Sequence, residues 1–502
     1  MGACLLGIDV GSSSIKAALI DIDSGETLAT AQSPTTEMAM DAPRPGWAEQ
    51  DPNIWWHHIR QAVNACLAQA KGPRPDVKGI GITYQMHGLV CIDSQHSVIR
   101  PSIIWCDSRA VAIGDKAFAE LGSDYCLKHL LNSPGNFTAS KLRWVLENEK
   151  EKFDQIKYFM LPGDYIAMKL TGEPSTTASG LSEGIFWDYP SQTVSQHLLD
   201  YYQIPAAIIP PIVSTFNNSL KLSQSAADEL GLKKGTPVSY RAGDQPNNAF
   251  SLNVLNPGEV AATAGTSGVI YAVTDKHASD SLSRVNTFIH VNDESKRGLR
   301  KNGILLCING TGIFNSWLRK LLSQGGDNVA YETLNDWAAK TPVGCGGLMC
   351  LPFGNGAERI LANKEIDSSI EGLNFNKHGV PELARAVQEG IVFAMRYGAD
   401  IISSMGQPVD RVRAGAANLF LSPVFREAFV NTLEVRLELY NTDGAVGAAR
   451  GAGVGIGCFK SFEEAFRGLK VIEVLEPDPL KTEQYKKAYS LWLQHLTQKL
   501  QS

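Results

Sequence analysis

Two short loops of similar composition, one near residue 10 and one after residue 260, constrain this chain more than any other feature. Residues 9–16 read Asp-Val-Gly-Ser-Ser-Ser-Ile-Lys, and residues 263–268 read Thr-Ala-Gly-Thr-Ser-Gly. Each loop lies between two apolar segments, which predicts a β-hairpin whose tip is nearly all backbone and hydroxyl. Such a tip presents N–H groups to an anion, because no bulky side chain keeps a phosphate away. Two of them predict twin domains that close on a nucleotide from both sides.

Length and composition agree with two α/β domains. A chain of 502 residues is too long for a single core. It is 44% apolar and 20% charged, which is ordinary for a soluble globular protein. The formal net charge of −6 argues against a surface for nucleic acid or anionic membrane. We therefore expect no nucleic-acid partner and no membrane partner.

The cysteines and the N-terminal residues bear on the cellular compartment. The chain has nine cysteines, an odd number, with no C-x-x-C pair, which predicts reduced and mostly buried thiols. The first residues lack the basic region of a signal peptide, and Leu6 stands where a myristoylation motif has Ser or Thr. The small-apolar stretch 444–459 is interrupted by Arg450 and is too short to span a bilayer. We expect a cytoplasmic protein.

The order of predicted elements places the domain boundary. Strands are expected at 5–10, 15–20, 77–85 and 89–92, with a helix over 52–70 that Asp51 caps. Residues 111–235 are predicted to be mostly helical. A second alternating unit is expected to begin near Val238, followed by a hairpin at 260–275, a strand at 304–308 and helices at 311–323, 381–405 and 482–500. We therefore predict two domains, residues 1–250 and 251–502.

Two aspartates interrupt apolar runs next to the predicted turns. Asp9 ends a buried strand beside the first hairpin, where a hydrated Mg²⁺ on nucleotide phosphates would compensate its charge. The alternative is a turn aspartate that bonds its own backbone. Asp244 lies at a strand-to-helix turn, where it could accept a proton from a hydroxyl that attacks phosphorus. The alternative is the N-cap of a helix at Gln245. Lys16 could neutralise phosphate charge or be a solvated side chain.

Two further segments carry groups that suit a sugar. Residues 84–88, Tyr-Gln-Met-His-Gly, place His87 at the predicted sheet edge, where the alternative is a structural histidine. Residues 104–109, Ile-Trp-Cys-Asp-Ser-Arg, end a strand with an aromatic ring, an acid and a base. Aromatic faces and short polar side chains together match the C–H faces and hydroxyls of a sugar. A buried Asp–Arg pair is the alternative for this segment.

In this order, the motifs resemble those of the FGGY carbohydrate kinases, members of the actin/hexokinase/Hsp70-type ATPase superfamily. The segments that carry the resemblance span nearly the whole chain: 7–16, 47–52, 85–88, 105–109, 161–165, 243–245, 265–268 and 356–359. Within the family, Gln-Met-His-Gly at 85–88 is most similar to the xylulokinases. The resemblance implies two ribonuclease H-like α/β domains flanking a deep cleft, the N-terminal one binding sugar and the C-terminal one binding ATP.

The resemblance also implies an activity and a set of site residues. It implies ATP-dependent phosphorylation of D-xylulose to D-xylulose 5-phosphate, with ATP and Mg²⁺ as cofactors and Asp244 as the catalytic base. It assigns Asp9 to the metal. The sugar-binding positions it implies are Gln85, Met86, His87, Trp105, Asp244 and Gln245. The ATP-binding positions it implies are Gly11, Ser12, Ser13, Lys16, Gly265, Thr266, Gly310, Gly415 and Asn418. A sugar and ATP are the expected partners, and a homodimer is compatible.

The chain departs from the family pattern at two places. Residues 413–418 read Arg-Ala-Gly-Ala-Ala-Asn where the family usually has Gly-Gly-Gly-Ala, so the β-carbons of Ala414 and Ala416 are expected to crowd an adenine. Gln245 stands where many xylulokinases have Asn and glycerol kinases have Gln. The alternatives are therefore a kinase for L-ribulose, another ketose, gluconate or glycerol, and a catalytically weak sugar-binding sensor. A chaperone-type ATPase is disfavoured.

Overall fold

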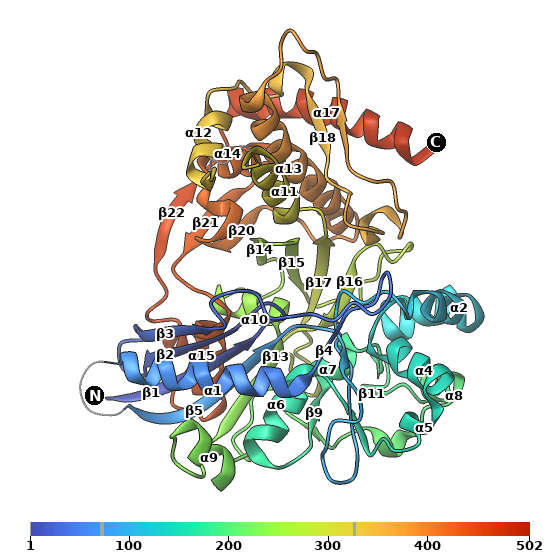
Figure 1. The fold of residues 1–502 in the computed structure, drawn as a ribbon, viewed down its shortest axis with the longest axis vertical. Coiled ribbons are helices and arrows are strands. Elements are labelled where there is room, and N and C mark those ends of the chain that lie inside the picture. The colour runs from blue at the N-terminus through green and yellow to red at the C-terminus, as the bar shows by residue number, and fades with distance from the viewer. Residues whose placement is uncertain (1, 71–74, 325–327, 502) are drawn as a thin grey trace. The chain divides into compact units, whose positions relative to one another are not determined.

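The computed structural model describes residues 2–70, 75–324 and 328–501, and the chain forms two compact units (Figure 1). Unit 1 comprises Met1–Asn253, Phe288–Asn302 and Thr442–Leu469. Unit 2 comprises Val254–Thr287, Gly303–Asn441 and Lys470–Ser502. Unit 1 thus recruits two segments from beyond the predicted boundary at residue 250. None of the described helices combines the length and the apolarity needed to cross a membrane.

The sheet of unit 1 has five strands in the order β13-β5-β1-β2-β3. Their bounds are β1 Ala3–Val10, β2 Ile15–Asp21, β3 Thr27–Ser33, β5 Asp76–Tyr84 and β13 Val238–Gly243. β1, β2 and β3 pair in antiparallel succession, which confirms the hairpin-rich start, whereas β5 runs parallel to both β1 and β13. The expectation that a second unit begins near Val238 is wrong, because β13 completes the first sheet. A buried parallel strand has the same apolar pattern in either place.

Helix α1, Pro52–Gln69, covers this sheet and begins as predicted, since the Asp51 side chain accepts a hydrogen bond from the Asn53 N–H over 2.9 Å. Residues 111–235 are mostly helical, as expected, with short strands between the helices. The α-helices of this region are α2 Val111–Leu121, α3 Ser123–Tyr125, α4 Thr138–Asn148, α5 Lys150–Phe153, α6 Pro162–Thr171, α7 Ala178–Glu183, α8 Gln196–Tyr202 and α9 Gln224–Leu230. α10, Asp244–Ser251, follows β13 directly.

Helix α15, Gly444–Gly455, comes from late in the chain but packs in unit 1. Its Ala445, Val446, Ala449 and Ala452 form a buried cluster with Leu5, Ala18 and Ile20 of β1 and β2. Two strand glycines allow the close approach. A β-carbon at Gly7 would lie 1.8 Å from the Ala445 carbonyl oxygen, and one at Gly81 would lie 1.9 Å from that of Ala448. The helix therefore rests on the strand backbone itself.

The sheet of unit 2 has seven strands in the order β16-β17-β15-β14-β20-β21-β22. Their bounds are β14 Val260–Ala264, β15 Gly268–Thr274, β16 Asn286–Ile289, β17 Asn302–Ile308, β20 Arg411–Gly415, β21 Arg436–Tyr440 and β22 Val471–Leu475. Its helices include α11 Gly312–Leu322, α12 Tyr331–Ala339, α13 Val380–Ser404, α14 Pro423–Leu433 and α17 Pro479–Gln501. The predicted hairpin at 260–275 and the helices near 311, 381 and 482 are confirmed.

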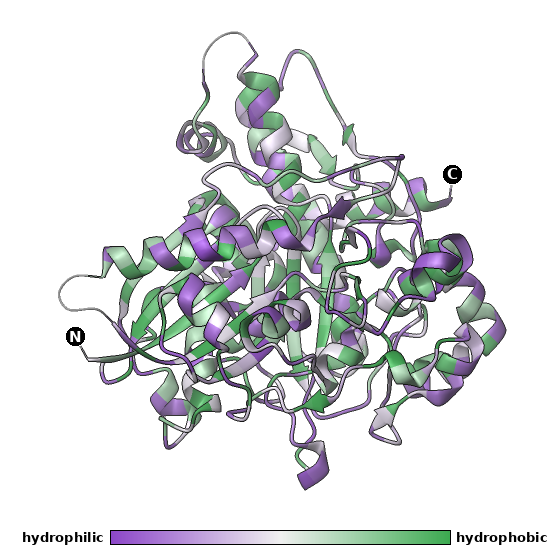
Figure 2. Cartoon of the chain, turned by 60° about the horizontal axis from the view of Figure 1, so that its bottom comes forward, coloured by the Kyte–Doolittle hydropathy of each residue, from purple (hydrophilic) through white to green (hydrophobic). Residues whose placement is uncertain are grey.

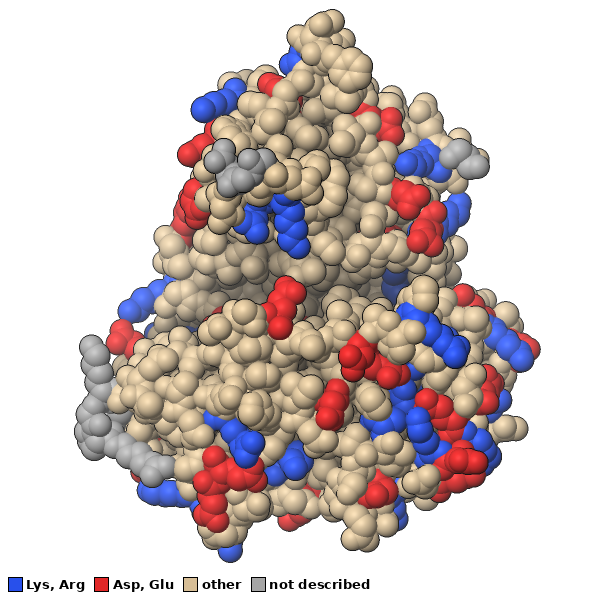
Figure 3. Space-filling view, in the orientation of Figure 1, with Lys and Arg blue, Asp and Glu red and all other residues tan. Residues whose placement is uncertain are grey.

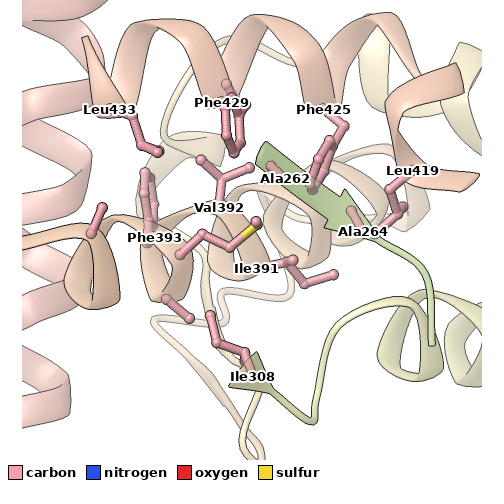
Figure 4. Close-up of a cluster of buried hydrophobic side chains, with 14 of the residues drawn as sticks. Ala262, Ala264, Ile308, Ile391, Val392, Phe393, Leu419, Phe425, Phe429 and Leu433 are labelled. Atoms are coloured by element: carbon pink, nitrogen blue, oxygen red, sulfur yellow. The ribbon is translucent and has the colours of Figure 1, made fainter. Parts of the chain in front are cut away.

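The core of unit 2 lies between this sheet and α13 and α14. Figure 4 shows Phe425 and Phe429 of α14 pointing toward Val392 of α13 and Ala262 of β14.

The strands are the more apolar elements, and polar residues concentrate on helices and loops (Figure 2). Charges of both signs are interspersed over the face of the molecule that Figure 3 shows. All nine cysteines are free thiols, and six of them are buried: Cys4, Cys66, Cys91, Cys126, Cys345 and Cys350.

Candidate active site

The carboxyl ends of three parallel strands bring the predicted polar segments of unit 1 to one sheet edge. Val10 of β1 pairs with Tyr84 of β5, and Tyr84 pairs with Gly243 of β13. The backbone N–H of Gln85 then donates to the Val10 carbonyl over 2.9 Å. Sites in α/β sheets form at this edge, where each strand releases its next residues into a loop. The first hairpin tip, residues 85–88 and Asp244 all leave the sheet here.

Two aspartates, Asp9 and Asp244, lie at this edge. Asp9 lies inside β1 rather than in a turn, so the turn-aspartate alternative is wrong. Asp244 is the first residue of α10, and Gly243 rather than Asp244 occupies the cap position. Burial raises the pKa of Asp9 to about 6, and Lys16, its cross-strand partner, opposes the rise. Burial, followed by the charge of Asp9, raises the pKa of Asp244 to about 7.

The start of α15 packs against Asp9. The Asp443 side chain caps this helix by accepting from the Val446 N–H over 2.9 Å. A β-carbon at Gly444 would lie 2.7 Å from an Asp9 carboxylate oxygen. The Asn247 side-chain amide of α10 donates to the Gly444 carbonyl over 2.9 Å. Glycine at 444 thus lets Asp9, α10 and α15 meet at one point.

These carboxylates fit a hydrated cation better than a cage of protein ligands. Within the described part of the chain, no three His, Cys, Asp or Glu side chains are arranged to hold a metal ion together. The pKa of Asp9 and that of Asp244 are both raised, so a positive charge beside them would be stabilised. Mg²⁺ keeps several of its waters and is commonly held by one or two carboxylates and substrate phosphates.

Two glutamines at the edge carry buried oxygens that meet no hydrogen-bond donor within the described residues. These are Oε1 of Gln85 and Oε1 of Gln245. Met86 is buried beside them, and a β-carbon at Gly243 would lie 2.7 Å from its Cγ. Buried polar atoms are usually paired, and unpaired ones call for an explanation. Hydroxyl groups of a ligand at this edge would supply the donors.

His87 is held in an unusual backbone conformation. Its φ of 61° lies in the left-handed region, which non-glycine residues seldom adopt. Its backbone N–H donates to the Glu183 carboxylate over 3.3 Å, and its ring Nδ1 lies 3.0 Å from the Glu183 carbonyl oxygen. A carbonyl oxygen only accepts, so the ring donates through its Nδ1–H. Strained backbone at a sheet edge is typical of functional positions.

Trp105 and the first hairpin are in direct contact. The indole Nε1–H of Trp105 donates to the Ser12 hydroxyl over 3.2 Å. The Gln50 side-chain amide donates to the Ser12 carbonyl over 2.7 Å and accepts from the Gln85 amide over 3.4 Å. Within the tip, the Gly11 N–H donates to the Ser14 carbonyl, and the Ser13 carbonyl accepts from Met38. The predicted sugar and phosphate segments of unit 1 therefore share one hydrogen-bond network.

The rest of the 104–109 segment is structural. Arg109 and Asp107 form a buried ion pair at 2.7 Å, which confirms the buried Asp–Arg alternative for these two residues. The Asp107 carboxylate also accepts from the Ala48 N–H over 2.6 Å, and Glu49 adds a second ion pair to Arg109. The Arg109 guanidinium lies 3.8 Å from the ring centroid of Trp47. This network fixes the backbone that carries Trp105.

In unit 2, the second hairpin tip rests on the first turn of α11. The Gly312 N–H donates to the Gly265 carbonyl over 2.9 Å, and the Ile313 N–H donates to that of Thr266 over 3.2 Å. A β-carbon at Gly312 would lie 2.2 Å from the Gly265 oxygen, so glycine is required for this contact. Thr266 itself is exposed at the tip. A small-residue hairpin tip beside a helix N-terminus offers N–H groups to phosphate.

The backbone N–H of Gly310 donates to a buried glutamate, Glu358. Glu358, which is 1% exposed, accepts from the Asn309 N–H over 3.0 Å and from the Gly310 N–H over 3.2 Å. Burial raises the pKa of Glu358 to about 7. A β-carbon at Gly310 would lie 1.4 Å from the Pro352 carbonyl oxygen. The loop that leads into α11 is therefore fixed on both sides.

The 413–418 segment, which departs from the family pattern, places one of its methyl groups in the core of unit 2. Ala414 is completely buried in the core of unit 2, and Ala416 packs against the same core. The expectation that the β-carbon of Ala414 crowds an adenine is therefore wrong, because alternation along β20 turns it into the core, whereas the expectation for the partly buried Ala416 stays a prediction. Gly415 ends β20, and Asn418 follows with a φ of 55°. A β-carbon at Gly265 would lie 3.5 Å from Asn418 Nδ2, so Asn418 adjoins the hairpin tip, while Gly415 follows Ala414, which pairs with Ala262 of the hairpin strand β14.

The sequence indicated no role for Glu183 or Glu358. In the structure, Glu183 binds the backbone N–H of His87 and Glu358 binds that of Gly310, and both of these residues are predicted site positions. Glu358 lies in the 356–359 motif that carries part of the family resemblance, so position was a usable signal. Glu183 stands alone between Ser182 and Gly184, and nothing local distinguishes it from a surface glutamate. Only the tertiary fold shows that its side chain is buried under His87.

Comparison with known proteins agrees with this architecture. The N-terminal domain of the FGGY family of carbohydrate kinases matches residues 4–251, and the C-terminal domain of that family matches residues 260–455. The xylulose kinase of Escherichia coli (strain K12) is 30% identical over 452 residues, which cover 89% of this chain and 88% of that protein.

Solved structures give the same result. The xylulose kinase from Rhodospirillum rubrum aligns with a TM-score of 0.86 at 28% identity, covering 99% of this chain and 98% of that one. The gluconate kinase from Lactobacillus acidophilus shares the fold, with a TM-score of 0.87 at 22% identity over 100% of this chain and 99% of that one. This chain belongs to the FGGY family of carbohydrate kinases, phosphotransferases of the actin/hexokinase-type α/β fold.

Proposed function

We propose that this kinase transfers the γ-phosphoryl group of ATP to the terminal hydroxyl of D-xylulose, giving D-xylulose 5-phosphate, with Asp244 as general base. The observation that carries the proposal is the environment of Asp244. Its pKa is raised to about 7, and it adjoins Gln245 and the edge where residues 85–88 leave the sheet. A carboxylate with a pKa near the working pH is suited to proton transfer. The E. coli relative, a xylulose kinase, supports the choice of sugar.

Asp244 acts while the phosphoryl group moves. Its ionised carboxylate accepts the proton of the sugar hydroxyl as the hydroxyl oxygen bonds to phosphorus and the bond between phosphorus and the leaving oxygen of ADP breaks. Little covalent work is left to the protein, so orientation and charge stabilisation provide most of the acceleration. We assign charge stabilisation to the backbone N–H groups of Ser12 and Ser13 and of Gly265 and Thr266, while Gly11, whose N–H donates to the Ser14 carbonyl, forms the turn that presents them.

Recognition of the sugar uses the groups gathered at the edge of unit 1. The buried Oε1 atoms of Gln85 and Gln245 accept from sugar hydroxyls, which satisfies two otherwise unpaired atoms. Met86 supplies apolar contact, and the rings of His87 and Trp105 line the same site. Gly310, Gly415 and Asn418 complete the nucleotide site on unit 2.

Asp9 is the residue that would hold Mg²⁺, through water, and Lys16 adds a positive charge across the strand pair. When bound with the nucleotide, Mg²⁺ neutralises charge on the phosphate oxygens. The residues present fit this role, since the pKa of Asp9 is raised to about 6 and burial leaves its charge poorly compensated.

A coupled assay of ADP release tests the proposal. Purified enzyme with ATP and Mg²⁺ is offered D-xylulose, L-ribulose, D-ribulose, gluconate and glycerol, and the Asp244→Asn variant serves as the matched blank. We expect kcat/KM for D-xylulose to exceed that for every other acceptor by at least tenfold. A higher kcat/KM for L-ribulose, gluconate or glycerol would make that compound the substrate and leave the proposed mechanism unchanged. Gln245 is the observation that keeps these acceptors in the panel.

A further inference from the structure

Lys141 of α4 is a completely buried lysine whose ammonium group meets two backbone carbonyls. Its Nζ donates to the carbonyl of His87 over 3.0 Å and to that of Ile104 over 2.9 Å. Burial lowers the pKa of Lys141 to about 8, although the charge of Asp107 opposes the shift. A buried ammonium is costly even when it is hydrogen-bonded. A methionine would fill the same space, so the charged group calls for a reason beyond packing.

The two carbonyls belong to the two segments of unit 1 that are predicted to contact sugar. His87 lies within 85–88, and Ile104 immediately precedes Trp105. The segments are separate in the chain and approach the edge from different strands, β5 and β7 (Ser102–Ile103). One ammonium group therefore joins them directly.

Helix α4 holds His87 from a second side as well. The ring of Phe137, the residue before α4, meets the His87 ring edge-on, with centroids 4.7 Å apart and planes at 84°. Glu183 binds the His87 N–H, while Lys141 binds the His87 carbonyl. The left-handed φ of His87 is thus fixed by hydrogen bonds at both ends of the residue. Such a conformation persists only where its surroundings determine it fully.

We propose that Lys141 is a positioning residue for the acceptor sugar, which holds the His87 and Trp105 segments at one fixed separation so that both meet the same molecule. The inference rests on the proposed sugar-binding role of these segments. Lys141 itself does not touch the sugar, because its Nζ is turned to the backbone behind His87 and Ile104. Loss of the ammonium would leave two carbonyls without this donor and let the segments move independently.

Steady-state kinetics of Lys141→Met separate positioning from general stability. We expect KM for the sugar to rise at least tenfold, kcat to fall by less, and KM for ATP to stay within twofold of wild type. Lys141→Gln keeps one N–H donor group, so its KM for the sugar should lie between that of wild type and that of Lys141→Met. Leu142→Ala is the matched control, since Leu142 is the next residue of α4 and is also completely buried. It should lower the melting temperature and leave KM for the sugar within twofold.

Amide hydrogen exchange in the sugar-free enzyme gives a readout that does not depend on the identity of the sugar. In Lys141→Met, peptides covering 85–88 and 103–109 should exchange faster together, while Leu142→Ala should leave both unchanged. An unchanged KM for the sugar with a lower melting temperature would overturn the inference, as would equal rises in both KM values. If wild type phosphorylates none of the acceptors, the proposed function fails and exchange alone decides the role of Lys141. Should Lys141→Met not fold, Lys141→Gln carries the same comparison.

Discussion

The indole N–H of Trp105 donates to the hydroxyl of Ser12 over 3.2 Å. One of these residues belongs to a predicted sugar segment and the other to a predicted phosphate-binding hairpin. Gln50 joins the same hairpin to Gln85 through its side-chain amide. A sugar that shifted Trp105 would therefore act on the hairpin through one hydrogen bond, and one that shifted Gln85 would act on it through two. We infer that acceptor and donor binding are coupled within unit 1 itself.

Asp244→Asn should abolish transfer and leave sugar binding nearly intact. Asparagine keeps the size of the side chain but cannot accept the proton, and general bases contribute about 10²- to 10⁴-fold to rate. We expect kcat to fall by that factor, with the Kd for sugar, measured by calorimetry, within about threefold of wild type. Retained turnover would remove Asp244 from the base role. Asp115→Asn, an exposed change on α2, is the control.

The same substitution should stabilise the metal-free protein at high pH. The pKa of Asp244 is about 7 in the folded state against 3.8 for an unperturbed aspartate. Because the folded protein binds more protons between these values, its free energy of unfolding falls as pH rises from about 4 to 7 and then stays level.

Asp244→Asn removes this penalty. We expect a gain on the order of 2–4 kcal/mol at pH 8 and almost none at pH 4. Urea unfolding in EDTA at the two pH values measures both gains. Equal gains at both pH values would show that the effect is not one of ionisation.

His87→Ala should affect the sugar far more than the nucleotide. The ring lies at the edge of unit 1, whereas the predicted nucleotide residues Gly265, Gly310 and Asn418 belong to unit 2. We expect KM for D-xylulose to rise by roughly tenfold or more, the loss of one buried hydrogen bond, while KM for ATP changes less than twofold. If the variant only melts at a lower temperature, His87 is a structural histidine.

Glu358→Ala should show the opposite selectivity. This glutamate binds the Asn309 and Gly310 N–H groups, so its removal leaves two donors without their acceptor in the loop that we propose binds the nucleotide. We expect KM for ATP to rise about tenfold and KM for sugar to stay constant. Glu365→Ala, an exposed change nearby in the chain, should alter neither. An effect on both substrates would indicate global destabilisation instead.

Ala414→Gly tests whether residues 413–418, which depart from the family pattern, crowd the adenine. The methyl group of Ala414 is buried in the core, so its removal should not improve nucleotide binding. We expect an unchanged KM for ATP and a loss of about 1–2 kcal/mol in unfolding free energy, from strand flexibility and lost packing. A markedly lower KM for ATP would restore the crowding hypothesis.

The features predicted from sequence were mainly local. The hairpins at 9–16 and 263–268, the Asp51 cap and the closing helix follow from turn chemistry and periodicity, and all are present. The position of β13 could not be predicted from the sequence. Its partner strand, β5, lies far from it along the chain, so the pairing depends on the tertiary fold and not on a local pattern.

The same limit applies to the site. The pattern alone showed Asp9 and Asp244 as carboxylates that interrupt apolar runs, and the strand ends bring them to one edge. Glu183 and Lys141 gave no such signal. A single glutamate or lysine on a helix is normally solvated, and only the packing of α4 and α7 buries these two.

Helix α15 has a consequence for how the chain must be made. β1 and β5 leave their glycine-lined backbone exposed until Ala445 and Ala448 are available to cover it. During synthesis, all five strands of the N-terminal sheet are therefore translated long before the helix that covers it. A fragment ending at residue 250 would present that bare surface permanently. Unit 1 can therefore complete its fold only after α15, close to the C-terminal end of this sequence, has been translated.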